Sequence, residues 1–272
     1  MIVDTHCHLD QAQFDGDRHA VIERAQAAGV EIIVNPGIDL ESSRQALALA
    51  AQYPGIYAAV GVHPNDCAGF DAAGLGVLRE LARQPKVVAI GEIGLDYHWK
   101  VVPHDQQLAA LRAQLALAAE LDLPIILHSR ESNADLMWEL EQWVSAVRTS
   151  PAGNDMLGVL HAFSGDLADA EKAYSLGFLL SLGGPVTFEN ARRLDALAPQ
   201  LRRDRLILET DAPYLTPHPH RGKLNEPGYL PLIAHSLAKL MDTDVETLAA
   251  QTSETALRFF RITQQRDRLA SN

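Results

Sequence analysis

Two histidines near the start of the chain have the spacing of a metal-binding pair. His6 and His8 follow the apolar residues Ile2 and Val3, and we expect all of them on one short β-strand. Because side chains alternate between the two faces of a strand, residues two apart project the same way. Two imidazoles on one face, beside Asp4, can bind a borderline divalent cation. On this stretch alone, a strand that happens to carry two histidines remains the alternative.

Ionisable side chains recur at the ends of later apolar runs that we expect to be strands. They are His63, Glu92, His128, Arg130, His161, Glu209 and Asp211. In barrels of alternating strands and helices, functional residues sit at the carboxyl ends of the strands, above an interior of branched apolar side chains. Grouping carboxylates and imidazoles there without a cation would cost several kcal/mol for each unpaired charge. The pattern therefore predicts a cation site at the mouth of a barrel.

Four histidines and two carboxylates of this set exceed what one zinc ion needs. Two metal ions about 3.5–4 Å apart that share one carboxylate would use all six residues. We expect Glu92 to be the shared ligand, since Gly91 and Gly94 beside it allow a close backbone approach. The two predicted ligand sets are His6, His8, Glu92 and Asp211 for one ion and Glu92, His128 and His161 for the other. Asp211 would also accept the proton of the attacking water, which makes Glu92 and Asp211 the predicted catalytic residues.

Other polar residues are candidates for substrate binding or for support of the ligands, each with a structural alternative. His63 could orient the substrate or serve as a capping or core histidine. Arg130 fits phosphate or carboxylate recognition, against a surface ion pair. Arg221 and Lys223, in a Pro- and Gly-rich loop, predict either a phosphate clamp or a solvated basic loop. Glu209 could orient a ligand from behind or be paired within the barrel.

Apolar runs and helical patterns alternate along the chain without a break. The expected strands are 2–10, 31–36, 57–63, 87–93, 124–128, 158–161, 178–182 and 206–211. The expected helices are 15–28, 40–52, 72–82, 104–121, 133–147, 167–176 and 189–197, followed by 229–241, 245–251 and 252–260. Such alternation predicts βα units and a parallel sheet, and eight units predict closure into a (β/α)8 TIM barrel.

A single domain over residues 1–272 fits this pattern, because barrels of this type run to about 250 residues. No linker, low-complexity tract or strong internal repeat divides the chain. The helices at about 228–262 are expected to pack on the barrel. A polar loop, 149–156, is expected between the fifth helix and the sixth strand.

The composition restricts the cellular compartments and the binding partners that we expect for this protein. The chain has no long apolar run and no basic segment followed by an apolar one at its start, so we expect a cytoplasmic protein without a membrane span. The two cysteines, Cys7 and Cys67, make no disulfide framework, and Cys7 is expected to be buried behind its strand. The net charge of −12 argues against a broad grip on nucleic acid, but it leaves phosphate chemistry at a metal site open.

The motifs that carry these residues resemble those of the TatD family of metal-dependent deoxyribonucleases, within the amidohydrolase-like barrels. In chain order they are Asp4-Thr-His-Cys-His8, Gly61-Val-His-Pro64, Gly91-Glu-Ile-Gly-Leu-Asp-Tyr97, Leu127-His-Ser-Arg130, His161-Ala-Phe-Ser-Gly165, Glu209-Thr-Asp-Ala-Pro-Tyr-Leu215 and Arg221-Gly-Lys-Leu-Asn-Glu-Pro227. The resemblance covers nearly the whole chain. Two departures stand out: a longer 149–156 loop, and Thr255 in place of the usual Asn, which would alter a local helix cap.

The resemblance implies a barrel with a divalent metal pair that hydrolyses phosphodiesters, often DNA from the 3′ end. It places the family's ligands on His6, His8, Glu92, His128, His161 and Asp211. We therefore expect a metal-dependent phosphodiesterase or deoxyribonuclease, of the 3′–5′ exonuclease type, that uses two Zn, Mg or Mn ions. DNA or another phosphodiester is the expected substrate. No obligate protein partner is inferred, and a monomer is the working expectation.

Three other functions would use the same residues. An amidohydrolase or lactonase would act on a small carbonyl compound at the same metal site. A PHP phosphoesterase also opens with His-x-His, but it would need more ligands in a different order. A non-catalytic scaffold would bind metal for stability alone. The scaffold predicts that chelation unfolds the protein, whereas an enzyme would keep its barrel and lose activity.

Overall fold

The computed structural model describes residues 1–147 and 155–262. They contain one eight-stranded sheet in which each strand pairs in parallel with the next one along the chain. The strands are β1 (Ile2–Asp4), β2 (Val30–Pro36), β3 (Ile56–Val60), β4 (Val87–Asp96), β5 (Ile125–Arg130), β6 (Gly158–Leu160), β7 (Phe178–Leu182) and β8 (Leu206–Leu208). Most of the predicted 149–156 loop lies outside the described residues.

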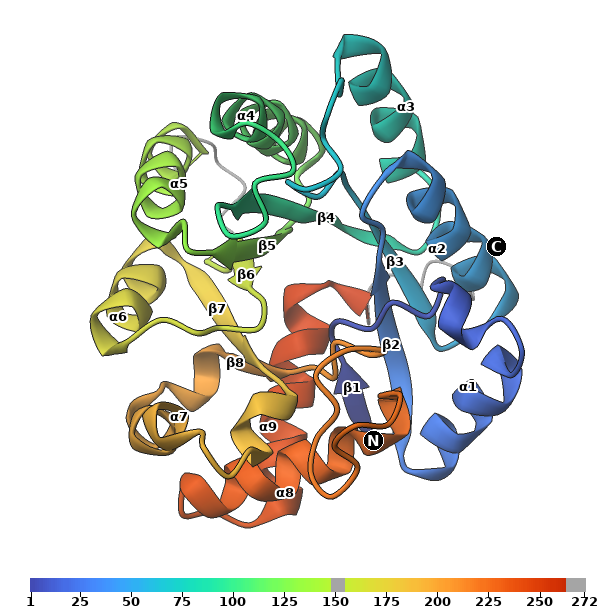
Figure 1. Cartoon of the computed structure of the whole chain (residues 1–272), viewed down its shortest axis with the longest axis vertical. Helices are drawn as coiled ribbons and strands as arrows, with labels where there is room; N and C mark the ends of the chain where they lie inside the picture. The colour runs from blue at the N-terminus through green and yellow to red at the C-terminus, as the bar shows by residue number, and fades with distance from the viewer. Residues whose placement is uncertain (148–154, 263–272) are drawn as a thin grey trace.

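The sheet curls until its last strand meets its first. Thr5 N donates a hydrogen bond to Leu208 O over 3.0 Å, and Cys7 pairs with Ala212 in an isolated parallel bridge. Figure 1 shows the resulting ring of strands with helices around it. The expected (β/α)8 barrel is therefore confirmed, although only a few hydrogen bonds close it between the first and last strands.

Helices cover the outside of the ring and one of its ends. They are α1 (Arg18–Ala27), α2 (Leu40–Gln52), α3 (Ala72–Ala82), α4 (His104–Leu121), α5 (Asn133–Val147), α6 (Leu167–Leu176), α7 (Arg192–Leu197), α8 (Leu230–Leu240) and α9 (Val245–Phe259). Figure 1 places α9 behind the ring. Phe259 and Phe260 pack there with Val3 and with Met156, which precedes β6, so the end of α9 closes the barrel at the amino ends of its strands.

Strand alternation divides the apolar residues between two cores. On β5, Ile125 and Leu127 belong to the layer between strands and helices, whereas Ile126 belongs to the barrel interior. Cys7 belongs to the outer layer and is fully buried, as the sequence predicted. Because apolar side chains fill the interior from the amino ends of the strands, polar side chains can gather only at the carboxyl ends.

Local sequence signals placed several helices correctly and missed other boundaries. The predicted helices at 72–82, 104–121, 133–147 and 167–176 coincide with α3 to α6. The predicted break at residue 251 is wrong, because no Gly or Pro interrupts α9. Thr255 is consequently buried inside that helix and caps no end of it. Four strands, β1, β3, β6 and β8, end before the polar residues expected at their tips.

None of the helices in residues 1–147 and 155–262 is long and apolar enough to cross a membrane. Cys7 and Cys67 are free thiols.

Candidate metal centre

Glu92 lies at the centre of the candidate site and belongs to β4. Its neighbours have no room for side chains: a Cβ on Gly91 would lie 2.6 Å from Ile126 Cβ, and one on Gly94 would overlap the carbonyl oxygen of His128. Gly94 also has a φ of +148°, which side chains rarely allow. The two glycines therefore bring β4 close to β5, with Glu92 buried between them.

His6 and His8 reach Glu92 from the segment just after β1, which ends at Asp4. Their Nε2 atoms are 3.1 Å apart and lie 3.3 and 3.7 Å, respectively, from Glu92 Oε2. Asp211 Oδ1 lies 3.9 and 3.6 Å from the same two nitrogens. Two imidazoles and two carboxylates thus face a common point.

His128 and His161 approach the other oxygen of Glu92. His128 Nδ1 and His161 Nε2 lie 2.9 and 2.8 Å from Glu92 Oε1, and 3.3 Å from each other. His63 Nε2 is 3.6 Å from the same oxygen. Glu92 therefore stands between two groups of donors, each of which faces one of its two oxygens.

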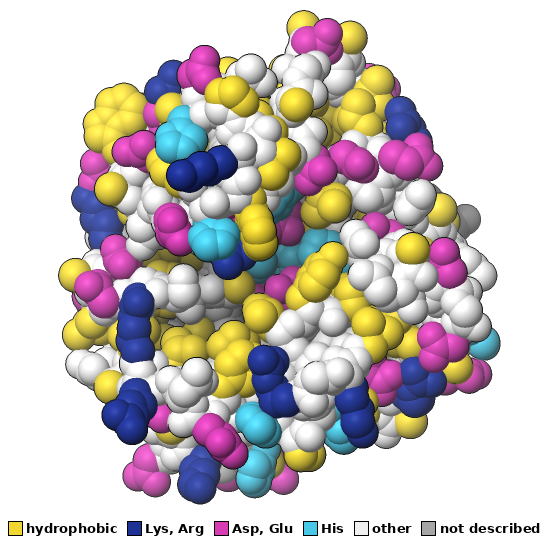
Figure 2. Space-filling model, in the orientation of Figure 1, with side chains coloured by type: hydrophobic (Ala, Val, Ile, Leu, Met, Phe, Trp, Pro, Cys, Tyr) yellow, Lys and Arg dark blue, Asp and Glu magenta, His cyan; other side chains and the backbone are white. Residues whose placement is uncertain are grey.

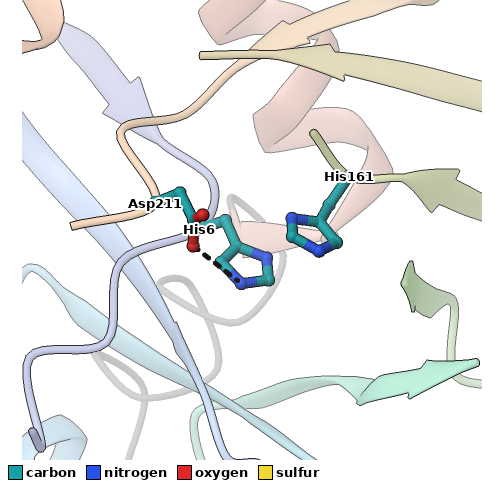
Figure 3. A group of neighbouring side chains, drawn as sticks. All are labelled: His6, His161 and Asp211. Atoms are coloured by element: carbon teal, nitrogen blue, oxygen red, sulfur yellow. Dashed lines mark ion pairs between the residues drawn. The ribbon is translucent and has the colours of Figure 1, made fainter. Parts of the chain in front are cut away.

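Asp211 joins the cluster through the closure of the barrel. β8 ends at Leu208, and Asp211 has a φ of +56°, so the strand alternation used in the prediction does not orient its side chain. Instead, Asp211 N donates to His6 O over 2.9 Å. Figure 3 shows the Asp211 carboxylate turned toward the His6 ring, which stacks on His161 with ring centroids 4.0 Å apart.

Burial and mutual charge set different protonation states within the cluster. Burial lowers the pKa of His6 to about 4. Burial acts in the same direction on His161, but the carboxylates of Glu92 and Glu209 outweigh it and hold the pKa well above its ordinary value. For Glu92, burial would raise the pKa, but the surrounding histidines keep it well below the usual range. Burial raises the pKa of Asp211 to about 6.

Asp96, which the sequence reasoning did not select, lies behind His128. Its Oδ2 is 3.2 Å from His128 Nε2 and accepts a hydrogen bond from Asn65 Nδ2 over 3.1 Å, while Oδ1 accepts one from Trp99 N. Burial would raise the pKa of Asp96, but these hydrogen bonds hold it below its ordinary value. A signal for this residue was present in the sequence, because Asp96 has the same strand parity as Glu92.

Glu209 lies behind His161 in a similar way. Its Oε1 accepts a hydrogen bond from Ala162 N over 2.7 Å and is 3.6 Å from His161 Nδ1. His63 is also largely buried, and its Nδ1 accepts a hydrogen bond from Asn65 N over 3.1 Å. Both residues therefore touch the donor cluster from its edges.

The basic residues predicted for substrate binding lie around the mouth of the barrel. Arg130 is exposed at the end of β5, with its guanidinium 5.3 Å from the centre of the Trp99 ring. Arg221 lies 3.9 Å from the centre of the Phe188 ring, and Lys223 is exposed in the same loop. Figure 2 shows a hollow in this face, with histidine and acidic side chains at its floor.

The donor set fits divalent cations. Three overlapping groups have ligand atoms within 4.8 Å of one another: His6, His161 and Asp211; His6, His8 and Glu92; His63, Glu92 and His128. Imidazole nitrogens only 3.1–3.3 Å apart crowd a buried carboxylate. A cation that accepts their lone pairs would replace this crowding with coordinate bonds, and zinc and manganese both accept such mixed ligands.

The sequence and the fold both match known proteins. A family model described as TatD related DNase matches residues 3–261. A Bacillus subtilis protein named uncharacterized metal-dependent hydrolase YabD is 43% identical, over 96% of this chain and all of its own. An Erwinia amylovora protein named 3′-5′ ssDNA/RNA exonuclease TatD is 38% identical, over 94% of this chain and 98% of its own.

A solved structure from Escherichia coli K12, described as YJJV, a TatD homolog, agrees with this fold. It superposes with a TM-score of 0.87 at 34% identity and covers 96% of this chain and 98% of its own. The motifs and the barrel lead to the same assignment as these comparisons. The chain belongs to the family of TatD-related DNases.

Proposed function

We propose that this protein is a divalent-metal-dependent phosphodiesterase that shortens single-stranded nucleic acid from the 3′ end. Relatives that are 36–38% identical carry the name 3′-5′ ssDNA/RNA exonuclease. The observation that carries the proposal is the position of Glu92, whose two oxygens face two separate groups of donors. This arrangement would suit a carboxylate that holds two metal ions.

In this proposal, the ligands divide into two sets that share Glu92. One set is His6, His8, Asp211 and Glu92 Oε2, and the other is His128, His161 and Glu92 Oε1. When bound, two ions would lower the pKa of a water molecule and neutralise charge on the phosphoryl oxygens. The four imidazoles favour zinc, and the carboxylates also admit manganese or magnesium.

Asp211 is the proposed proton acceptor. Its side chain is 14% exposed, compared with 4% for that of Glu92, so it is the more accessible of the two carboxylates to incoming water. Without a bound metal, burial raises the pKa of Asp211 to about 6, so this carboxylate takes up a proton more readily than an ordinary aspartate. Glu92, which the surrounding histidines keep ionised despite its burial, remains available as a ligand.

The remaining polar residues are proposed to hold the substrate or to position the ligands. The proposed substrate contacts are His63, Arg130, Arg221 and Lys223. Guanidinium groups such as that of Arg130 can bind two phosphate oxygens at once. Glu209 is proposed to orient His161 through its Nδ1, as carboxylates commonly do for metal-binding histidines.

The alternatives have less support. Solved structures of enzymes that act on carbonyl or amide compounds, such as a Fervidobacterium islandicum β-aspartyl dipeptidase, share only the fold, at 12% identity and a TM-score of 0.61. A non-catalytic scaffold does not agree with relatives that are named as hydrolases. We retain a cytoplasmic monomer as our expectation, which cell fractionation and size-exclusion chromatography would test.

The test is turnover of 5′-labelled oligonucleotides with Mg²⁺, Mn²⁺ or Zn²⁺ supplied in turn. We expect a ladder of progressively shorter labelled single strands and little cleavage of blunt duplex. Glu92→Gln, which keeps the side-chain shape, is the matched inactive control. A panel of lactones is assayed in parallel. Hydrolysis of a lactone together with intact oligonucleotides would contradict the proposal.

A further inference from the structure

Exposed apolar side chains gather at the mouth of the barrel. Among the residues described, seven large apolar side chains are exposed, and five of them lie in the loops after β4 and β8: Trp99, Val101, Tyr214, Leu215 and Leu224. Figure 2 shows hydrophobic and basic side chains around the rim of the central hollow. Exposed aromatic rings beside positive charge are the features with which proteins bind unpaired nucleobases.

Trp99 is the most exposed aromatic side chain of this group, at 57%. Its ring has Arg130 on one side, with the guanidinium 5.3 Å from the ring centre, and His98 at its edge, with ring centroids 4.9 Å apart. The indole is thus held by neighbours and still leaves more than half of its surface to solvent. Arg130 adds a positive charge at the place where a nucleic-acid backbone would pass.

The loop that carries Trp99 is fastened at both ends. Gln107, which is fully buried, donates from Nε2 to the carbonyl oxygens of Asp96 and Val102, over 2.9 Å in each case. Asp96 Oδ1 accepts hydrogen bonds from His98 N and Trp99 N. An exposed ring on such a fastened loop is preorganised and loses little conformational freedom when a ligand binds.

The same carboxylate connects Trp99 to the metal centre. Trp99 N lies 3.2 Å from Asp96 Oδ1, and His128 Nε2 lies 3.2 Å from Asp96 Oδ2. Arg130 follows His128 by two residues on β5. The loop that carries Trp99 is therefore anchored beside the donor cluster, on the side of His128.

We propose that Trp99, held by Arg130, is a stacking platform for an unpaired nucleobase one or two nucleotides from the scissile phosphate. The inference rests on the proposed function and adds to it a residue that selects the substrate. Because a paired base is covered by its neighbours, the platform accepts a single strand or a frayed end. The interaction depends on the ring face of the base and not on its hydrogen-bonding edge, so it tolerates all four bases.

The first test compares oligonucleotides that lack one base at the first, second or third position from the 3′ end. With the wild-type protein, one abasic position should raise KM by about 5- to 150-fold, the range for loss of one base stack. Trp99→Ala should raise KM for the intact strand by a similar factor and remove the penalty at that position. Trp99→Phe should retain part of the effect.

The control is Trp138→Ala, which removes a tryptophan of α5 that is similarly exposed, at 54%, and that should leave KM unchanged. The second readout is the ratio of kcat/KM for the oligonucleotide to that for methyl p-nitrophenyl phosphate, a diester without a base. This ratio should fall in Trp99→Ala. A ratio that stays constant would mean that Trp99 supports the loop or the metal centre and would overturn the platform.

Direct binding separates this inference from the proposed function. In a background with Trp138→Phe and Trp143→Phe, Trp99 is the one remaining tryptophan of the three in the sequence. Its fluorescence should be quenched by an intact oligonucleotide, and less by the strand that lacks the stacked base. If the wild-type protein cleaved no oligonucleotide, the proposed function would fail. The quenching experiment would still show whether a nucleobase stacks on Trp99. Absence of quenching by any single strand would overturn it.

Discussion

Two pairs of histidines flank Glu92 and differ in what lies behind them. The β1 pair is His6 and His8, and the β5–β6 pair is His128 and His161. A buried carboxylate lies behind each member of the β5–β6 pair, at 3.2 and 3.6 Å. Behind the β1 pair, a backbone carbonyl oxygen lies 3.2 Å from His8 Nδ1. Within the described part of the chain, neither His6 Nδ1 nor His161 Nδ1 makes a hydrogen bond, but His161 Nδ1 has the Glu209 carboxylate 3.6 Å away.

Because of this difference, His6 and His161 have different pKa values, and metal binding at the two pairs releases different numbers of protons. A carboxylate behind a histidine fixes the ring and makes the nitrogen on the other side a stronger donor. Without a metal, burial lowers the pKa of His6 to about 4, whereas the carboxylates around His161 raise its pKa well above the usual value. His6 is therefore neutral and open to a cation near pH 7, while His161 must first release a proton.

The largest effect is expected from removing the residue that joins the two pairs. Glu92→Ala should abolish turnover and lower the metal content of both halves, because each pair loses its shared carboxylate oxygen. Far-UV circular dichroism should stay nearly unchanged, since the barrel interior lies below the site. Elemental analysis and a turnover assay check this. Retained activity in this variant would remove Glu92 from the centre of the mechanism.

Removal of the metal should affect the whole site without unfolding the barrel. Dialysis against a chelator should abolish activity, leave the circular dichroism spectrum in place, and lower the melting temperature, because a bound ion stabilises only the folded state. Activity should return on addition of the metal. Loss of the folded spectrum on chelation would instead support the scaffold alternative.

Variants behind the β5–β6 pair should distinguish the two halves. Asp96→Asn and Glu209→Gln should each weaken one of the two metal-binding steps by about 10- to 100-fold and leave the other step unchanged. Isothermal titration calorimetry resolves the two steps. Asp204→Asn, at an exposed carboxylate paired with Arg202, is the control. Equal weakening of both steps would show that the halves do not differ as described.

The pH dependence of metal binding should differ between the halves. A histidine with a raised pKa holds a proton that the metal must displace, so affinity at the β5–β6 pair should increase with pH, by up to about tenfold per pH unit for each proton released. In the half with the β1 pair, burial lowers the pKa of His6 to about 4 and raises that of Asp211 to about 6, so above about pH 7 neither group holds a proton that the metal must displace. Titrations in buffers of different ionisation enthalpy count the released protons. Equal counts for both steps would be inconsistent with this difference.

The smallest effect is expected at His63, which lies 3.6 Å from Glu92 Oε1 and belongs to neither pair. His63→Ala should lower kcat by about tenfold or less, below the 10- to 100-fold range typical of groups that support metal ligands. Metal content should stay the same. A loss as large as that of Glu92→Ala, with metal released, would make His63 a ligand.

The local pattern of the sequence determined the alternation of strands and helices, and with it the barrel. It also selected the residues that gather at the mouth of the barrel. Imidazoles and carboxylates grouped at the ends of apolar strands cost free energy unless a cation binds them. Gly91 and Gly94 indicated from the sequence alone that the backbone beside Glu92 approaches another segment closely. These features depend on residues close together in the sequence. They therefore appear in the sequence itself, as a periodic pattern of apolar residues or as a particular residue type.

Only the tertiary structure decided how the gathered residues face one another. His6, His8, His161 and Asp211 lie beyond the ends of their strands, where alternation no longer orients a side chain and barrel closure does. The pairing of each Glu92 oxygen with a different group, the carboxylate of Asp96 behind His128, and the contact between Trp99 and Arg130 all join separate βα units. Such contacts depend on how far each strand extends and how its loop returns, which the local pattern does not encode.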